Sequence, residues 1–418
     1  MSLALTLEDR ALLNGEGGEA AALAMRVLVE TARLMGAEKL IPIASAHIDG
    51  ALYHGDAGTL FAEKLVAGGA KVAVRSTLNV GALDLHCGAK TRLPAHEHAM
   101  AKRMMLAYEA MGCEASWTCA PYQAGHRPSL GSDVAWGESN AVAFCNSVLG
   151  ARTNRYGDYL DICCAITARA PSYGLHIPKN RLARFALDCS GLSAELRDSE
   201  VFWPVIGTLY GQKAGNDVGV VLGLENYATE DRLKAFGAAA ASAGAVGLFH
   251  ILGVTPEAPD MKTVAGGDHA LPVIPVTPAM LGSARAGLST STEAKIDAVA
   301  IGSPHCSVEE LLALDGLIAG RRLAVPFYAC TGRHAVKALE AAGRRAAIEA
   351  AGVTLVADTC IVVTPILSAI SGVLMTNSGK FAHYAPGNTG YGVQYGALKD
   401  CVESAVSGRL MRDERLWQ

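Results

Sequence analysis

Residues 298–357 read AVAIGSPHCSVEELLALDGLIAGRRLAVPFYACTGRHAVKALEAAGRRAAIEAAGVTLVA, and they carry the clearest fold signal in the chain. It contains three short apolar runs with the length and composition of buried strands, at 298–301, 324–329 and 354–357. A helical pattern at 311–318 follows Ser307-Val-Glu-Glu310, which has the spacing of a capping box. A second helical pattern at 334–351 ends at Gly352. This alternation predicts a parallel sheet with right-handed crossovers.

Three cysteines follow the ends of these predicted strands, namely Cys306, Cys330 and Cys360. Ligands of parallel sheets bind beyond the carboxyl ends of the strands, so the three segments are expected to share one crevice. Cys119 lies far upstream, in Trp117-Thr-Cys119-Ala-Pro-Tyr122. Isolated cysteines that only folding brings together are what an iron–sulfur cluster with an open coordination site needs.

The rest of the chain alternates in the same way. In the middle, predicted strands at 218–224 and 246–252 flank a helix at 230–243. In the first third, predicted strands at 39–44 and 71–74 flank a helix at 59–67, and polar loops follow at 45–50 and 76–79. We therefore expect an α/β protein with mostly parallel sheets. It is divided into an N-terminal unit at 1–200, a middle unit at 201–290 and a C-terminal unit at 291–418.

Composition restricts the class of protein. The chain has 418 residues, of which 50% are hydrophobic, and a net charge of −4, so no basic footprint suits nucleic acid. No apolar run reaches the roughly 18 uncharged residues of a membrane span, and the N-terminus lacks the pattern of a secretory signal. The eleven cysteines form no CxxC motif, which favours a reducing cytoplasm over disulfides, zinc ribbons or ferredoxin-type clusters.

Two segments are unusually polar. Residues 138–155, ESNAVAFCNSVLGARTNR, place many polar side chains around a short apolar helix. Burying them is unfavourable unless they form hydrogen bonds, and a small anionic substrate would provide partners; the alternative is a polar helix cap that joins two domains. The second segment is Thr376-Asn-Ser-Gly-Lys380-Phe-Ala-His-Tyr384, in which Lys380 suits a carboxylate or phosphate, or is a surface loop lysine.

Most other cysteines are expected to be small buried side chains, and Cys87 and Cys145 are ambiguous. The cysteines assigned to the core are Cys113, Cys163, Cys164, Cys189 and Cys401. Among the histidines, His47 and His305 are the two that fall in predicted crevice loops.

Five ordered motifs resemble the aconitase X family, over nearly the whole chain from about Ser45 to Tyr384. They are Thr118-Cys-Ala-Pro-Tyr122, Glu138-Ser-Asn-Ala141 with residues 146–154, Gly302-Ser-Pro-His305, Asp358-Thr-Cys360 and Asn377-Ser-Gly-Lys380. The resemblance implies an aconitase-like arrangement of α/β domains around an iron–sulfur cluster. It also implies a dehydratase, acting on cis-3-hydroxy-L-proline or, as in the archaeal branch, on mevalonate 5-phosphate.

The resemblance also assigns residues. Cluster ligands match Cys119 and Cys360, and the third lies near Ser303, where some members have cysteine; here Cys306 follows three residues on. The cluster type, [2Fe-2S], [3Fe-4S] or [4Fe-4S], stays open. A small swivelling domain is expected as a separate subunit, because a fused chain would be longer. The implied substrate contacts are His47, Asp49, Gly50, Ala51, Leu52, Asn79, Val80, Ser139, Asn140 and Lys380.

Dehydration beside a carboxylate requires removal of the α-proton and departure of a poor leaving group. An iron with an open site assists the second step as a Lewis acid. A positioned base performs the first, and Lys380, Ser45 and Ser139 are the candidates. Loss of the 3-hydroxyl would give an enamine that tautomerises to the cyclic imine Δ1-pyrroline-2-carboxylate.

Loop chemistry favours cis-3-hydroxy-L-proline over mevalonate 5-phosphate. The loops at 47–52 and 79–81 differ from the archaeal Ser-Gly-Val-Ser and Asn-Pro patterns. Asp49 would pair with a ring ammonium and repel a phosphate. Two alternatives of other classes are a non-catalytic iron–sulfur sensor and a cluster-free enzyme with Cys119 or Cys360 as nucleophile. The second lacks a local Cys–His signature.

Overall fold

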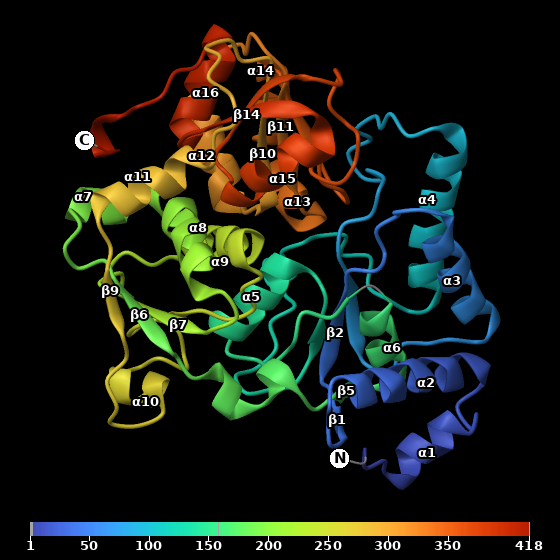
Figure 1. Ribbon diagram of the computed structural model, residues 1–418. Coiled ribbons are helices and arrows are strands. Elements are labelled where there is room, and N and C mark those ends of the chain that lie inside the picture. Colours follow the sequence, from blue (N-terminus) through green and yellow to red (C-terminus); the bar gives the residue numbers. More distant parts are fainter. Residues whose placement is uncertain (1–2, 158, 418) are drawn as a thin grey trace. The chain divides into compact units, whose positions relative to one another are not determined.

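The computed structural model describes residues 3–157 and 159–417 as two compact units of packed helices and strands (Figure 1). Unit 1 comprises the residues up to Leu83 together with Leu93–Leu182, and unit 2 comprises Asp84–Arg92 and Ala183–Gln418. The predicted α/β class with mostly parallel sheets is confirmed. The threefold division of the chain stays a prediction.

The largest sheet lies in unit 2 and has the strand order β12-β11-β10-β13-β14, with every pair parallel. Its strands are β10 (Ala298–Cys306), β11 (Phe327–Thr331), β12 (Val353–Val356), β13 (Gly372–Thr376) and β14 (Tyr391–Tyr395). The strand–helix–strand order predicted for 298–357 is therefore confirmed. The helices of this region are α12 (Val308–Ile318), α13 (Arg333–Ala341), α14 (Arg345–Ala351), α15 (Gly379–Thr389) and α16 (Leu398–Ser407).

Local chemistry sets these boundaries. Ser307 accepts from the N–H of Glu310 at 3.1 Å and Glu310 accepts from the N–H of Ser307 at 2.8 Å, so the predicted capping box begins α12. The single helix predicted over 334–351 is wrong. Gly343, at φ +66°, separates α13 from α14, because a left-handed residue ends a helix.

Strand β10 runs five residues beyond the predicted apolar stretch. Its Gly302 has φ +88°, and a Cβ there would lie 2.0 Å from the carbonyl oxygen of Cys330 on β11. Only glycine permits this approach. The segment that follows, Ser303–Cys306, is thereby held against β11, which extends the sheet past the point where the hydrophobic pattern stops.

A second sheet of unit 2 has the order β8-β7-β6-β9, also parallel. Helices α8 and α9 pack closely against each other, and the predicted middle strands and helix are confirmed with shorter strands. The elements are β6 (Phe185–Asp188), α7 (Ala194–Asp198), α8 (Phe202–Ala214), β7 (Gly219–Leu222), α9 (Glu230–Gly244), β8 (His250–Ile251), α10 (Met261–Ala265), β9 (Val273–Pro275) and α11 (Pro278–Ala286).

Unit 1 contains the parallel sheet β3-β2-β4 and the antiparallel pair β1-β5. Its strands are β1 (Leu40–Pro42), β2 (Ser45–Ile48), β3 (Arg75–Leu78), β4 (Ala135–Trp136) and β5 (Arg169–Pro171). Its helices are α1 (Leu7–Leu13), α2 (Glu19–Leu34), α3 (Asp56–Ala67), α4 (Ala95–Ala110), α5 (Ser139–Ser147) and α6 (Leu160–Thr167).

Two loop predictions in unit 1 are wrong. Residues 45–48 and 76–78 were expected in polar loops, yet they form the buried strands β2 and β3, and the strand expected at 71–74 lies outside both. The reason is that Ser45, His47 and Thr77 form hydrogen bonds inside the unit, which removes the usual cost of burying polar side chains.

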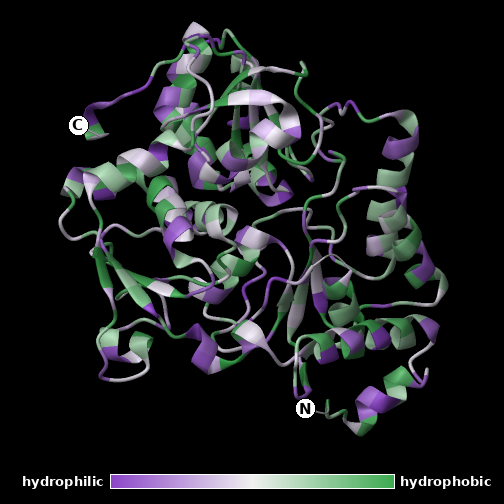
Figure 2. Ribbon diagram, viewed as in Figure 1, coloured by the Kyte–Doolittle hydropathy of each residue, from purple (hydrophilic) through white to green (hydrophobic). Residues whose placement is uncertain are grey.

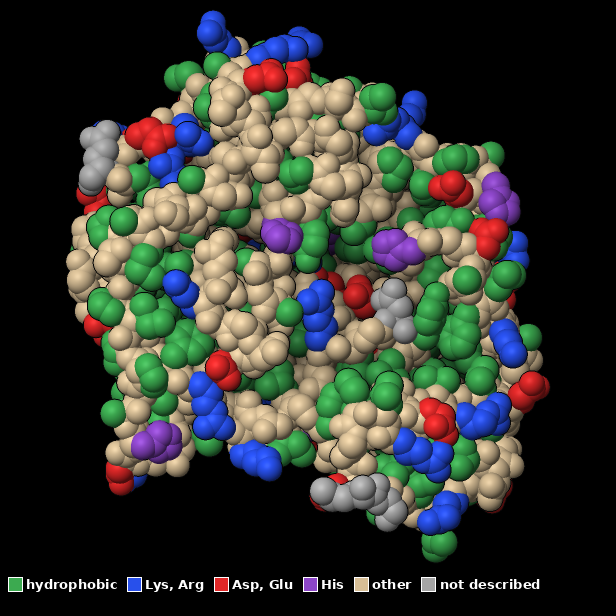
Figure 3. Space-filling model, viewed as in Figure 1, with side chains coloured by type: hydrophobic (Ala, Val, Ile, Leu, Met, Phe, Trp, Pro, Cys, Tyr) green, Lys and Arg blue, Asp and Glu red, His purple; other side chains and the backbone are tan. Residues whose placement is uncertain are grey.

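Hydrophobic and hydrophilic residues alternate along the surface helices, as Figure 2 shows for α2, which buries Met25, Leu28 and Val29. The face in Figure 3 carries Lys and Arg side chains interspersed with Asp and Glu. Within residues 3–157 and 159–417, no helix combines the length and apolar character of a membrane span.

The α8–α9 contact gives a test of packing. A Cβ on Gly211 would lie 2.6 Å from the carbonyl oxygen of Ala240, so Gly211→Ala should destabilise the fold by about 1–3 kcal/mol through overpacking. The matched control is Gly282→Ala in α11, where a Cβ meets nothing within 4 Å; there alanine should stabilise by about 0.5–1 kcal/mol. Urea unfolding of both variants measures the difference, and equal midpoints would contradict the close packing of α8 on α9.

Candidate active site

The residues expected to form the site fall into two groups, one in each unit, and each group is described by itself. Unit 1 holds Ser45, His47, Asp49, Gly50, Ala51, Leu52, Asn79, Val80, Cys119, Ser139 and Asn140. Unit 2 holds Ser303, Cys306, Cys330, Cys360 and Lys380.

A chain of four buried side chains crosses one face of the sheet in unit 1. His47 Nδ1 lies 2.9 Å from Thr77 Oγ1, which lies 2.7 Å from His126 Nδ1. His126 Nε2 in turn lies 2.8 Å from Ser45 Oγ. Strand pairing explains the arrangement, because His47 and Thr77 are register partners on β2 and β3, and Ser45 shares the face of His47 two residues earlier.

The imidazoles of His47 and His126 are both neutral near pH 7. Burial lowers the pKa of His47 to about 3, helped by the charge that His126 would carry. Burial, followed by the nearby Arg75, lowers the pKa of His126 to about 4. Trp136 packs on both rings, with centroids 5.5 Å from His47 and 4.9 Å from His126. Burial against Trp136 thus keeps the two rings uncharged.

The turn after β2 is fixed by Asp161 of α6. One oxygen of Asp161 accepts from the N–H of Asp49 at 2.6 Å and of Gly50 at 3.2 Å. Burial raises the pKa of Asp161 to about 7, and the charge of Asp49 adds to this. The half-buried Asp49 accepts a hydrogen bond from the side-chain amide of Asn79. The predicted substrate loops at 47–52 and 79–81 therefore meet at this carboxylate.

The N-terminus of α5 carries Ser139 and Asn140. Glu138 caps the helix by accepting from the N–H of Ala141 at 2.6 Å, and Ser139 donates to the same carboxylate at 3.1 Å. The amide of Asn140 donates to the carbonyl oxygen of Cys119 at 3.2 Å, so the Cys119 motif and the α5 motif are in contact.

Much of the polar segment 138–155 is satisfied within unit 1. Asn146 bonds the backbone of Thr153 through both of its amide atoms and accepts from Arg181 at 2.9 Å. Most polar atoms of this segment therefore need no ligand as a hydrogen-bond partner. Of the buried side-chain atoms without a hydrogen-bond partner among the described residues, three belong to predicted substrate contacts: His47 Nε2, Asn79 Oδ1 and Asn140 Oδ1.

In unit 2, Cys360 follows β12 and is surrounded by polar groups. The thiol of Cys330 donates to its sulfur, which lowers the pKa of Cys360 and raises that of Cys330. The N–H of Val362, the charge of Lys380 and the hydroxyl of Ser303 act in the same direction on Cys360, against the effect of burial. The structure thus places Ser303 and Cys330 beside Cys360, although the sequence motifs favoured Cys119 as its companion.

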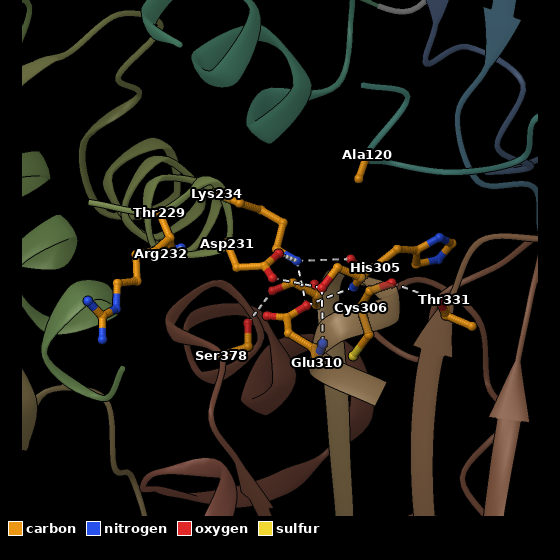
Figure 4. Close-up of polar contacts among 12 residues, drawn as sticks. Ala120, Thr229, Asp231, Arg232, Lys234, His305, Cys306, Glu310, Thr331 and Ser378 are labelled. Carbon is orange, nitrogen blue, oxygen red and sulfur yellow. Dashed lines mark hydrogen bonds and ion pairs between the residues drawn. The ribbon is translucent and has the colours of Figure 1, made fainter. Parts of the chain in front are cut away.

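The segment that carries Ser303 and Cys306 is clamped by Lys234 of α9 (Figure 4). The Lys234 ammonium donates to Asp231 at 2.8 Å, to Glu310 and to the carbonyl oxygen of His305 at 3.4 Å. Burial alone would lower the pKa of Lys234, but the carboxylates of Glu310 and Asp231 together outweigh burial and raise the pKa above its usual value. The ammonium therefore stays charged. Cys306 itself is buried in the apolar core beneath, with Leu311 and Phe327.

A cavity of about 650 Å³ lies within unit 2 beside this clamp. The motifs Gly302–His305 and Asn377–Lys380 meet on its wall, because Ser378 donates from its hydroxyl to the carbonyl oxygen of Ser303. Ser378 also caps α15 by accepting from the N–H of Phe381 at 3.0 Å, which fixes Lys380 in the first turn. The volume of this cavity suits a small molecule.

Several residues of these two groups were missed by sequence reasoning. His126, Asp161 and Lys234 belong to no quoted motif, Thr77 was expected only as a loop residue, and Cys330 was placed in the crevice but assigned no role. In residues 3–157 and 159–417, no group of three or more His, Cys, Asp or Glu side chains is arranged to hold a metal ion. The ligand set Cys119, Cys306 and Cys360 stays a prediction.

The Lys234 clamp gives a second test. Lys234→Met leaves the carboxylates of Asp231 and Glu310 without their cation, so the free energy of unfolding should fall by about 3–5 kcal/mol. The control, Lys213→Met on the exposed end of α8, should change stability by less than about 0.5 kcal/mol. Chemical denaturation measures both, and equal values would show that the clamp contributes nothing to stability.

Comparison with known proteins gives the family. The sequence matches the aconitase X first domain at residues 2–179, the second domain at 183–286 and the third domain at 296–407. The crystal structure of Thermococcus kodakaraensis aconitase X in a holo-form superposes with a TM-score of 0.86 at 32% identity, covering 96% of this chain and 100% of that chain.

Curated relatives carry two names. A cis-3-hydroxy-L-proline dehydratase of Pseudomonas aeruginosa is 43% identical over 96% of this chain and 70% of its own length. Another of that name, from Hypocrea jecorina, is 38% identical over 98% of this chain and 69% of its own length. A phosphomevalonate dehydratase large subunit of Methanothermobacter thermautotrophicus is 37% identical over 93% and 95%. The chain belongs to the aconitase X family and is a hydro-lyase.

Proposed function

We propose that this chain dehydrates cis-3-hydroxy-L-proline to Δ1-pyrroline-2-carboxylate. The observation that carries the proposal is the half-buried Asp49 carboxylate, which the side-chain amide of Asn79 orients at the meeting point of the two predicted substrate loops. A carboxylate pairs with the ring ammonium of an amino acid and repels a phosphate. The 43% and 38% identity to relatives named for this substrate supports it, and phosphomevalonate is the alternative.

An iron–sulfur cluster fits the thiol chemistry of unit 2. Cluster ligands are thiolates, and the surroundings of Cys360 lower its pKa despite burial. We propose Cys360 and Cys119 as ligands, with Cys306, the Ser303 position or Cys330 supplying the third. When bound, the cluster would supply a Lewis acid for the departing hydroxyl. The relative solved as a holo-form supports a bound cofactor in the family.

Among the proposed bases, Ser45 has the most favourable setting. A serine becomes a base when a neighbouring group accepts its proton, and the neutral His126 Nε2 lies 2.8 Å from Ser45 Oγ. Ser139 instead donates to the carboxylate of Glu138 over a longer distance, 3.1 Å. Lys380 stabilises the Cys360 thiolate by its charge. We therefore assign α-proton removal to Ser45 and substrate positioning to Ser139, Asn140 and Lys380.

A separate small subunit is the proposed partner. Relatives named as large subunits have 95% and 98% of their length covered by this chain, which supports a two-subunit enzyme. A reducing cytoplasm suits the chain's eleven cysteines, all of which are free thiols.

Asp49→Asn tests the substrate. Loss of a charge-assisted contact of about 1.5–3 kcal/mol should raise the KM for cis-3-hydroxy-L-proline roughly 10- to 150-fold. Asp217→Asn, an exposed carboxylate in unit 2, is the matched control and should leave the KM unchanged. Wild-type turnover of mevalonate 5-phosphate, with none of cis-3-hydroxy-L-proline, would refute the proposal.

Cysteine variants test the cluster. Anaerobically purified wild type should contain iron and sulfide and absorb visible light, and Cys360→Ala should lose all three. Cys401→Ala, a core position in α16, should retain them. Comparing Cys306→Ala with Cys330→Ala identifies the third ligand, since only the ligand variant should lose iron. A colourless, iron-free wild type that is fully active would rule out the cluster.

A further inference from the structure

The hydrogen-bonded chain of unit 1 offers more than a base. It links Ser45 Oγ through His126 and Thr77 to His47, and all four residues are buried, with exposed fractions of 6%, 2%, 2% and 0%. At the far end, His47 Nε2 has no hydrogen-bond partner among the described residues. A chain with one serine end and one unsatisfied imidazole end has the form of a proton conductor.

Proton counting restricts what this chain can be. The single Thr77 hydroxyl faces two imidazole nitrogens, at 2.9 Å and 2.7 Å, and can donate to only one of them. The other nitrogen must carry a proton and donate to Thr77. With both rings neutral, two arrangements have Thr77 donating to one ring, and in these the two Nδ1 atoms are in opposite states. If both Nδ1 atoms instead donate to the two lone pairs of Thr77, the hydrogen-bonded chain cannot pass a proton.

In the first arrangement, Ser45 donates to His126 Nε2, His126 Nδ1 donates to Thr77, and Thr77 donates to His47 Nδ1. His47 Nε2 then carries a proton and has no acceptor for it among the described residues. In the second arrangement each of these hydrogen bonds points the opposite way, and His47 Nε2 is an unprotonated acceptor. One proton taken up at Ser45 and one released at His47 converts the first arrangement into the second without leaving net charge inside.

We propose that these four hydrogen-bonded side chains carry the proton of the dehydration. Thr77 and His126 act as positioning residues that couple Ser45 to His47. The inference rests on the proposed function. Ser45 Oγ takes the α-proton as its own proton passes to His126, and the C–H electron pair forms the new C=C bond. The C–O bond breaks with its electron pair on oxygen, and that oxygen receives the proton of His47 Nε2 and leaves as water.

The proton balance closes within the reaction. The substrate loses one proton from carbon and its hydroxyl gains one, so no charge accumulates on the four side chains. After product release, water returns a proton to His47 Nε2 and accepts one at Ser45, which restores the first arrangement. Strand pairing makes the coupling possible, because it fixes His47 beside Thr77 while the backbone of β2 holds Ser45 on the same face.

Thr77→Val tests the coupling while leaving the Ser45–His126 pair in place. In the holoenzyme with its small subunit, kcat for cis-3-hydroxy-L-proline should fall about 10²- to 10⁴-fold with KM unchanged. Exchange of the α-hydrogen with D2O, followed by NMR, should persist, so the ratio of exchange to dehydration rises. Thr77→Ser keeps the hydroxyl and should stay within a few-fold of wild type.

Ser76→Ala is the matched control, because Ser76 is the neighbouring buried hydroxyl on β3 and bonds only the carbonyl oxygen of Val74 among the described residues. It should change neither kcat nor the exchange ratio. A Thr77→Val enzyme with unchanged kcat, or one that loses exchange and dehydration equally, overturns the coupling. A wild type without dehydratase activity overturns the proposed function instead.

If Thr77→Val does not fold, 15N NMR of histidine-labelled wild type decides the question. Both rings should be neutral between pH 6 and 8 (about the range of an ordinary histidine pKa), with the two Nδ1 atoms in opposite protonation states. A protonated imidazolium at either position, or Nδ1 atoms in the same state, overturns the proposal.

Discussion

Parallel strand pairing is the constraint on which both units depend. Parallel strands bring their carboxyl ends to one edge of a sheet, and several candidate residues in each unit lie at or near such an edge. In unit 2 this rule collects Ser303 and Cys330, in the last residues of β10 and β11, with Cys360, which follows β12. In unit 1 it collects Asp49 and Asn79 after β2 and β3. Helices and loops then supply the groups that hold these segments in place.

Burial of polar groups is the second theme, and hydrogen bonding decides where it is tolerated. The four-residue chain on the β2–β3 face, the Asp161 carboxylate under the Asp49 turn and the Lys234 ammonium under the His305 segment are all buried. Apart from His47 Nε2, these groups form hydrogen bonds inside their own unit, so the cost of desolvation is offset by short hydrogen bonds and charge pairing. Three of the atoms that stay unsatisfied belong to residues proposed to contact substrate, His47, Asn79 and Asn140.

Fold prediction from the sequence succeeded where hydrophobic patterns were long. The strand–helix–strand order of 298–357 and the capping box at Ser307 were readable because local chemistry alone specifies them. It failed at β2 and β3, since Ser45, His47 and Thr77 look like loop residues until their hydrogen-bond partners are known. It also failed at Gly343, where a left-handed glycine divides a continuous helical pattern.

The sequence by itself determined the α/β class, the family motifs and most of the candidate residues, because motif spacing and strand ends are local properties of the chain. Which side chains meet became visible in the folded protein. The tertiary structure placed Cys330 and Ser303 beside Cys360, joined His126 to Ser45 across 81 residues, and set Asp161 beneath a turn 112 residues away. Such contacts depend on strand register and helix packing, which no local pattern in the chain specifies.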